Sequence, residues 1–258
     1  MTKERPLILV TNDDGIYAPG IRALVKAALK FGDVVVVAPD KPQSGMGHAI
    51  TINSTLRVEE VHAHEGARAW SCSGTPVDCV KMAVNKLLSR KPDLCISGIN
   101  HGANHSINVI YSGTMSAAME GAIEGVPSIG FSLLDYSIEA DFLAAQHYAE
   151  KLIAFVLKAG MERGVCLNVN IPKGPLEEIK GLRVVRQAQG TWIEELDERT
   201  DPAGRKYYWL TGRFENFEPD ADDTDAFALQ HNYVSVVPVQ FDLTAYNVMP
   251  NMKQLEGI

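Results

Sequence analysis

The sequence predicts an α/β protein, a Rossmann-like three-layer sandwich in which a mostly parallel sheet lies between two layers of helices. Three observations predict this class. Short apolar runs alternate with segments whose apolar residues recur at helical spacing. The first runs are almost continuously apolar, as expected for parallel strands that are covered on both faces. The 258 residues are enough for one large domain or for a core with a small addition.

Strands and helices are predicted in alternation through the first two thirds of the chain. Leu7–Thr11 (LILVT) is a buried strand that ends in a polar turn, Gly20–Phe31 is a helix, and Val34–Ala38 (VVVVA) is the next strand. Further strands are predicted at Leu56–Val61, Ala67–Cys72, Leu94–Ser97, Val126–Phe131 and Val165–Ile171, the first two as a possible pair. Further helices are predicted at Pro76–Leu88, Thr114–Glu124 and Glu139–Ala159.

The start of the helix at Pro76–Leu88 has a specific local signature. Thr75 is placed to cap the helix, and Pro76 suits its first position because proline lacks the N–H that would be unpaired there. Asp78 completes a capping-box pattern with Thr75. We therefore expect the helix to begin at Pro76.

The chain changes character after residue 180. Thr191–Leu196 and Lys206–Thr211 are predicted as the two strands of a hairpin, joined by the turn-rich segment ERTDPAGR. A strand at Tyr233–Val239 and a helix from Thr244 follow. We expect residues 1–180 to form a Rossmann-like catalytic core. Residues 181–258 are expected to form the hairpin arm, the last strand and the C-terminal helix of the same structural unit.

The predicted hairpin is rich in aromatic residues, including Trp192 and Trp209. An aromatic hairpin that stands alone would be poorly covered, and such a surface is typical of an oligomer contact or an exchanged arm. The alternative is that the hairpin packs on its own core. We expect self-association.

The charge balance excludes several partners. There are 24 Lys and Arg against 32 Asp and Glu, a formal net charge of −8, with no basic block. Duplex nucleic acid and anionic membrane are therefore not expected as partners.

No apolar run reaches the roughly 18 residues that a membrane span needs, and the polar start does not resemble a signal peptide. We expect a cytoplasmic location. The four cysteines, none in a CxxC pair, are expected to be buried and reduced.

Polar clusters follow several predicted strands. They are Asn12–Gly15, Pro39–Gly45, Ser97–Asn104 and Ser112–Thr114. The carboxyl ends of parallel strands meet at one edge of a doubly wound sheet, so we expect these clusters to lie together there.

Asp13 and Asp14 are adjacent carboxylates at the end of the first strand. Like charges this close need a cation or hydrogen bonds to compensate them. Oxygen ligands suit Mg²⁺ or Mn²⁺, and Ser44 and Asn100 could add a hydroxyl and an amide oxygen. The alternative is an ordinary polar turn. Asn12 stands two residues before Asp14, and an amide cannot be the nucleophile of a phospho-aspartate mechanism.

Ser112, Gly113 and Thr114 precede a predicted helix. Hydroxyls and free N–H groups at a helix start can bind an anion, and a simple cap by Thr114 is the alternative. Loop histidines His48, His101 and His105 could donate to phosphate or move a proton, or could be ordinary polar surface. The common GxSxG, GxxxxGK[ST] and GxGxxG motifs are absent at the expected places.

Five segments in order, ILVTNDDGIYAPGI, APDKPQSGMGHAIT, CSGTPVDCV, PDLCISGINHGANHS and YSGTMSAAMEG, resemble the stationary-phase survival protein SurE family. The segment TDAFALQHNYVSVVPVQFDLT resembles the closing pattern of that family, so the resemblance covers essentially the whole chain. It implies a metal-dependent phosphatase acting on nucleoside 5′- and 3′-monophosphates, and in some members on short polyphosphate. It also implies dimers or tetramers that exchange the hairpin and the C-terminal segment.

The resemblance implies a specific set of site residues. One divalent cation per subunit, Mg²⁺ or Mn²⁺, would be held by Asp13, Asp14, Ser44 and Asn100, with the two aspartates as catalytic residues. The substrate phosphate would be held by Asn104, Ser112, Gly113, Thr114 and Gly45. Few base-reading residues are identifiable, so broad tolerance of the nucleobase is expected. A nucleotide-sugar transferase and a non-catalytic nucleotide sensor remain as alternatives.

Overall fold

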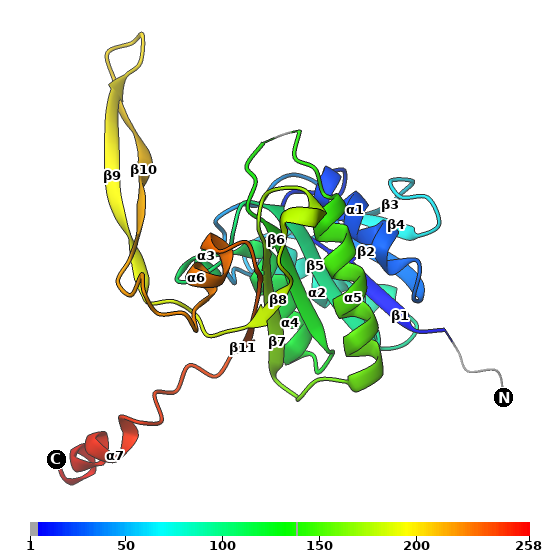
Figure 1. Ribbon diagram of the computed structural model, residues 1–258. Helices are drawn as coiled ribbons and strands as arrows, with labels where there is room; N and C mark the ends of the chain where they lie inside the picture. The colour runs from blue at the N-terminus through cyan, green and yellow to red at the C-terminus, as the bar shows by residue number, and fades with distance from the viewer. Residues whose placement is uncertain (1–4, 138) are drawn as a thin grey trace.

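The computed structural model describes residues 5–137 and 139–258 (Figure 1). Within them the main sheet has nine strands in the order β3-β4-β2-β1-β5-β6-β7-β11-β8. The strands are β1 (Leu7–Thr11), β2 (Asp33–Pro39), β3 (Val58–Val61), β4 (Arg68–Cys72), β5 (Leu94–His101), β6 (Ser128–Leu133), β7 (Val165–Ile171), β8 (Leu182–Val184) and β11 (Val234–Gln240). The central strands run parallel, whereas β3 and β11 are antiparallel to β4 and β7.

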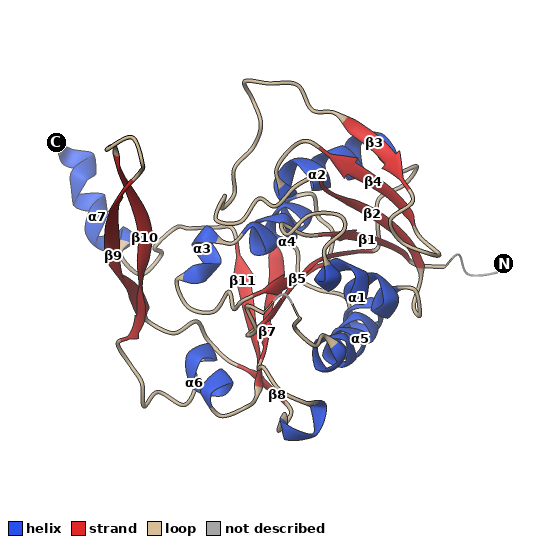
Figure 2. Cartoon of the chain, turned by 90° about the horizontal axis from the view of Figure 1, so that it is seen from above, coloured by secondary structure: helices blue, strands red, loops and turns tan. Residues whose placement is uncertain are grey.

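Helices cover both faces of this sheet, as predicted for a three-layer sandwich. In Figure 2, α1 (Pro19–Ala28) and α5 (Leu143–Ala159) lie on one face, and α2 (Pro76–Met82) and α4 (Gly113–Ile123) lie on the other. Alternate residues of a strand point to opposite faces. Accordingly, Ile8 of β1 packs into the core under α1 and α5, and Leu9 packs into the core under α2 and α4.

The end of α2 and the starts of α5 and α7 differ from the predicted helix boundaries. The capping box of Thr75 and Asp78 is present, but α2 ends at Met82 and continues as a π-helical turn at Ala83–Leu87. The helix α5 begins at Leu143 rather than Glu139. The described residues also contain the short α-helices α3 (Asn108–Tyr111), α6 (Asp225–Gln230) and α7 (Met249–Met252) and 3₁₀ helices at Leu176–Glu178 and Lys253–Gly257. Helix α7 begins later than the predicted Thr244.

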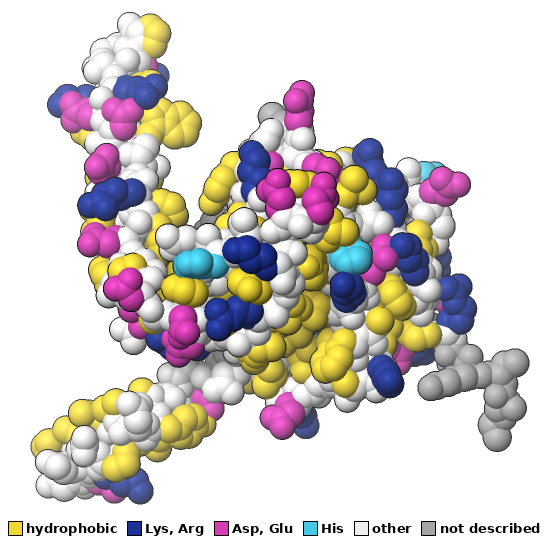
Figure 3. All heavy atoms as spheres, in the orientation of Figure 1, with side chains coloured by type: hydrophobic (Ala, Val, Ile, Leu, Met, Phe, Trp, Pro, Cys, Tyr) yellow, Lys and Arg dark blue, Asp and Glu magenta, His cyan; other side chains and the backbone are white. Residues whose placement is uncertain are grey.

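The hairpin is longer than predicted and stands away from the core (Figure 1). Its strands β9 (Gly190–Thr200) and β10 (Lys206–Asn216) form a separate two-stranded sheet. Tyr207, Tyr208 and Trp209 are exposed on it. Figure 3 shows further apolar side chains along the segment that follows β11, where Leu243 is 93% exposed. By contrast, β8 and β11 belong to the main sheet.

All four cysteines are buried free thiols, as predicted: Cys72, Cys79, Cys95 and Cys166. None of the described helices is long and apolar enough to cross a membrane.

Candidate functional site

The predicted polar clusters meet at the carboxyl edge of the parallel strands. A pocket of about 200 Å³ there is lined by residues from all four clusters, among them Asp13, Ser44, Gly45, Asn100, Asn104 and Ser112. Gly113 and Thr114 pack against Asp13, and Asp14 approaches the pocket residue His101. The structure therefore brings the whole predicted set together.

Asp13 is the buried centre of this site, with a residue exposure of 4%. Its carboxylate accepts a hydrogen bond from the hydroxyl of Thr114. Burial raises the pKa of Asp13 to about 6; the Thr114 hydrogen bond opposes the rise and the Asp14 carboxylate adds to it. A carboxylate held in this way is expected to have a cationic partner in the working protein.

The start of α4 fits closely against Asp13. Ser112 caps the helix, because its hydroxyl accepts a hydrogen bond from the Met115 N–H at 3.0 Å. The predicted alternative of a cap by Thr114 is therefore wrong, and the Thr114 hydroxyl serves Asp13 instead. A Cβ added at Gly113 would lie 2.7 Å from the Asp13 Cβ, so only glycine lets the helix begin this close to the carboxylate.

Asn100 presents an amide oxygen to the site. Its Nδ2 donates to the carbonyl oxygens of Gly102, at 2.8 Å, and His101, at 3.2 Å. Because the amide nitrogen is used in this way, the oxygen is the atom that remains for a ligand. The Asp14 carboxylate lies 3.4 Å from both the backbone N and the Nδ1 of His101.

These groups fit a hard divalent cation. Two carboxylates, an amide oxygen and the Ser44 hydroxyl are all oxygen donors, the ligand type that Mg²⁺ and Mn²⁺ prefer. Within the described residues, no group of three or more His, Cys, Asp or Glu side chains could hold a metal ion. No cysteine lines this pocket, and His101 is the one histidine among its described lining residues.

Asn104 is fixed in the pocket wall by a buried amide network. Its N–H donates to Asn170 Oδ1 at 2.7 Å, its Nδ2 donates to Ser132 Oγ at 2.8 Å, and its carbonyl accepts from Asn168 Nδ2 at 2.8 Å. Sequence reasoning missed these partners. The available signal was a pair of asparagines within the otherwise apolar strand VCLNVNI.

Of the three loop histidines, only His101 lines the pocket. His48 Nε2 lies 2.9 Å from the buried Glu120 carboxylate, whose other oxygen accepts from Lys81. This contact ties the loop that carries Ser44 to α4 and α2. His105 is half-buried against Phe214 at the base of the hairpin, where burial lowers its pKa.

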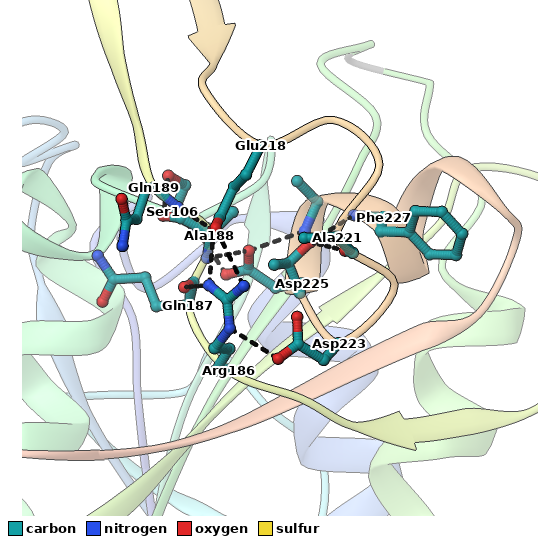
Figure 4. A network of polar contacts seen from close by, with 12 residues as sticks. Ser106, Arg186, Gln187, Ala188, Gln189, Glu218, Ala221, Asp223, Asp225 and Phe227 are labelled. Atoms are coloured by element: carbon teal, nitrogen blue, oxygen red, sulfur yellow. Dashed lines mark hydrogen bonds and ion pairs between the residues drawn. The ribbon is translucent and has the colours of Figure 1, made fainter.

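The base of the hairpin is anchored beside the site by a second group that sequence reasoning missed. The buried Asp225 carboxylate accepts from the backbone N–H groups of Ser106, at 2.8 Å, and Ala188, at 2.9 Å (Figure 4). Arg186 pairs with Glu218 and Asp223 next to it. The acidic stretch EPDADDTD therefore contains a structural residue, Asp225, as well as solvated charges.

Three aromatic side chains also line the pocket: Tyr111, Tyr136 and Trp192. The Trp192 Nε1 donates to Asn108 Oδ1 at 2.6 Å. The sequence indicated Trp192 only as part of the aromatic hairpin. The structure shows that the first residues of the hairpin reach the site.

Fold and site together define an α/β protein with a carboxylate-centred, oxygen-rich pocket at the carboxyl edge of a parallel sheet. The chain belongs to the SurE family, because the family model described as Survival protein SurE matches residues 8–194. The resemblance inferred from the motifs is thereby confirmed.

Curated relatives match over nearly the whole chain. The protein is 61% identical over 254 residues to the 5′-nucleotidase SurE of Christiangramia forsetii, covering 98% of this chain and 97% of the relative. It is 59% identical over 253 residues to the 5′-nucleotidase SurE of Flavobacterium johnsoniae, with 98% and 97% covered. The crystal structure of the SurE protein from Aquifex aeolicus matches with a TM-score of 0.84 and 40% identity, covering 97% of this chain and 100% of that chain.

Proposed function

We propose that this protein is a divalent-metal-dependent phosphomonoesterase that hydrolyses nucleoside 5′- and 3′-monophosphates to nucleoside and phosphate. Short polyphosphate is a further proposed substrate. The observation that carries the proposal is the buried Asp13 carboxylate, set between the Asp14 carboxylate and the first turn of α4. The activity named for relatives at up to 61% identity supports it.

Asp13, Asp14, Ser44 and Asn100 are the proposed ligands of one cation per subunit, Mg²⁺ or Mn²⁺. When bound, the cation would supply charge neutralisation at the phosphoryl group and lower the pKa of a coordinated water. The Asn100 contacts to backbone carbonyls hold its amide in a fixed orientation. This fixed amide and the capped start of α4 would prearrange the donor set before the substrate arrives.

The phosphoryl group is proposed to lie against Ser112, Gly113 and Thr114, with Gly45 and Asn104 beside it. The first N–H groups of an eleven-residue helix have no partner within the helix and carry partial positive charge. They suit the equatorial oxygens of a phosphoryl group, whose transfer needs mainly positioning and charge neutralisation. One of the two aspartates, Asp13 or Asp14, is proposed to accept the proton of the attacking water.

Self-association is proposed as the role of the hairpin and the C-terminal segment. Trp209 is 57% exposed and Leu243 is 93% exposed, and apolar surface of this kind is typical of an interface. We propose a homo-oligomer, a dimer or a tetramer, in which the hairpin and the C-terminal segment of one subunit pack on another, with residues 1–180 as the catalytic core. The net charge of −8 disfavours duplex DNA and membrane partners, and a cytoplasmic location is proposed.

The test is phosphate release from a panel of 5′- and 3′-nucleoside monophosphates after chelation, with Mg²⁺ or Mn²⁺ added back singly. We expect release that requires the added metal and that Asp13→Asn abolishes. Asp220→Asn, which removes an exposed carboxylate that does not line the pocket, is the matched control and keeps the activity. Folded protein that binds nucleotide but releases no phosphate with either metal would overturn the proposal in favour of a sensor or a transferase.

A further inference from the structure

A second pocket adjoins the one that contains Asp13. It has a volume of about 400 Å³ and is lined by Tyr111, Trp192, Glu194, Leu210, Thr211 and Gly212. Tyr111 and Trp192 line both pockets. The two cavities therefore adjoin at these two side chains, with the carboxylates and the helix start on one side and aromatic and aliphatic side chains on the other.

The indole of Trp192 is held in a defined orientation. Its only N–H donates to Asn108 Oδ1 at 2.6 Å, and its ring meets the edge of Phe214 with centroids 6.4 Å apart. Asn108 begins the short helix that ends at Tyr111, next to the cap Ser112. Even so, Trp192 is 37% exposed and Tyr111 is 55% exposed. The oriented Trp192 indole and the neighbouring, exposed Tyr111 side chain thus offer open ring surface beside the proposed phosphate site.

We propose that Tyr111 and Trp192 form the subsite for the nucleobase, which binds them by stacking. This inference rests on the proposed function and deepens it. Because the indole N–H is occupied by Asn108, the ring offers a π-face rather than a donor. The remaining polar side chains of the second pocket are Glu194 and Thr211. Stacking is tolerant of base identity because every base has a π-face, so the subsite selects for a base without selecting which one.

The two side chains shared by the pockets argue for the substrate as the occupant. A phosphate at the start of α4 lies beside Tyr111, because Tyr111 and Ser112 are consecutive residues at the junction of α3 and α4. A volume of about 400 Å³ is within the range of small-ligand sites. The exposed aromatic group of Tyr207, Tyr208 and Trp209 lies further along the hairpin, outside this pocket.

The test compares nucleotides with an ester that has no base. We would measure kcat/KM for AMP, CMP and ribose 5-phosphate with wild type, Trp192→Ala, Trp192→Phe and Tyr111→Ala. The preference for each nucleotide over ribose 5-phosphate should fall about 10-fold or more in the two alanine variants, and less than about 3-fold in Trp192→Phe, which keeps an aromatic face. Trp209→Ala, which removes an exposed indole elsewhere on the hairpin, should keep the wild-type ratio.

Equilibrium dialysis with adenosine separates this inference from the proposed function. Adenosine should bind wild type and bind each alanine variant about 10-fold more weakly, even if no phosphomonoester were hydrolysed. A wild type without preference for nucleotides and without adenosine binding would overturn the subsite. An equal loss of kcat/KM for all three esters in both alanine variants would also overturn the subsite. Tyr111 and Trp192 would then be structural residues, or interface residues if the oligomeric state changed as well.

Discussion

Thr114 donates its hydroxyl hydrogen bond to the buried carboxylate of Asp13, across 101 residues of sequence. The contact joins the second residue of α4 to the end of β1. Because Ser112 caps the helix, the Thr114 hydroxyl is available for this contact. The contact thus holds the end of β1 and the start of α4 in place relative to each other. Asp13, a proposed metal ligand, is oriented by Thr114, a proposed phosphate-binding residue.

Replacing Thr114 by valine should destabilise the protein by about 1–3 kcal/mol, because the buried Asp13 acceptor loses its donor. Thr114→Ser keeps the hydroxyl and should lie within about 1 kcal/mol of wild type, although it loses a methyl group. Urea unfolding in the presence of a chelator measures both values without a contribution from bound metal. Equal stabilities for the valine and serine variants would show that the hydrogen bond contributes nothing.

Gly113→Ala tests the close approach of α4 to the carboxylate. The new Cβ would lie 2.7 Å from the Asp13 Cβ and 2.9 Å from its Oδ2, so the Asp13 side chain must move. A displacement of a reacting group by about 1 Å can lower the rate about 100-fold. We expect a folded protein whose kcat for AMP falls on the order of 10- to 100-fold, measured alongside the circular dichroism spectrum. Wild-type kcat in this variant would place the reacting atoms away from Asp13.

The fold could be predicted because its elements have strong local signatures. Leu7–Thr11 was predicted with the bounds that it has, since an apolar run followed by Asn-Asp-Asp-Gly marks both a buried strand and its end. The hairpin strands were predicted too short, because the turn-rich segment ERTDPAGR indicates a loop soon after Leu196, where residues 197–200 in fact continue the strand. In the structure these residues pair regularly with β10. Helix α5 begins at Leu143 rather than at Glu139, and no strong capping pattern marks either position.

The site could be predicted in part, because parallel strands bring their polar ends to one edge. What sequence reasoning missed depends on contacts between distant segments. Asp225 was hidden in an acidic stretch and acts 119 residues away on Ser106. Trp192 was assigned to the hairpin surface, and only the path of the chain places it in the pocket. Such pairs leave no spacing pattern in one sequence.

Asp225→Asn should loosen the base of the hairpin. The carboxylate accepts three backbone N–H groups, from Ser106, Ala188 and Ala226, and an amide offers one oxygen while placing its NH₂ against a donor. We expect a loss of about 1.5–3 kcal/mol in the free energy of unfolding. Hydrogen exchange of the Ser106 and Ala188 amides should also accelerate. Asp222→Asn in the same stretch, at an exposed position, should leave both unchanged; unaltered exchange in Asp225→Asn would contradict the anchoring role.

Glu120 should make stability depend on pH in the acid range. Burial alone would raise the pKa of Glu120, but its hydrogen bonds with His48 and Lys81 outweigh burial and hold the pKa below the ordinary value of 4.5. A carboxylate whose pKa is lowered on folding stabilises the protein above its unfolded-state pKa, and this contribution disappears as the pH falls through the folded-state value. Glu120→Gln should therefore be about 1–3 kcal/mol less stable than wild type at pH 7. The difference in stability between the two proteins should narrow below about pH 4.5.

Urea unfolding at pH 7 and below about pH 4.5 measures this difference, with Glu59→Gln, at an exposed position, as the control. A difference that grew on acidification would refute the assignment, since the pKa of Glu120 would then be raised rather than lowered on folding.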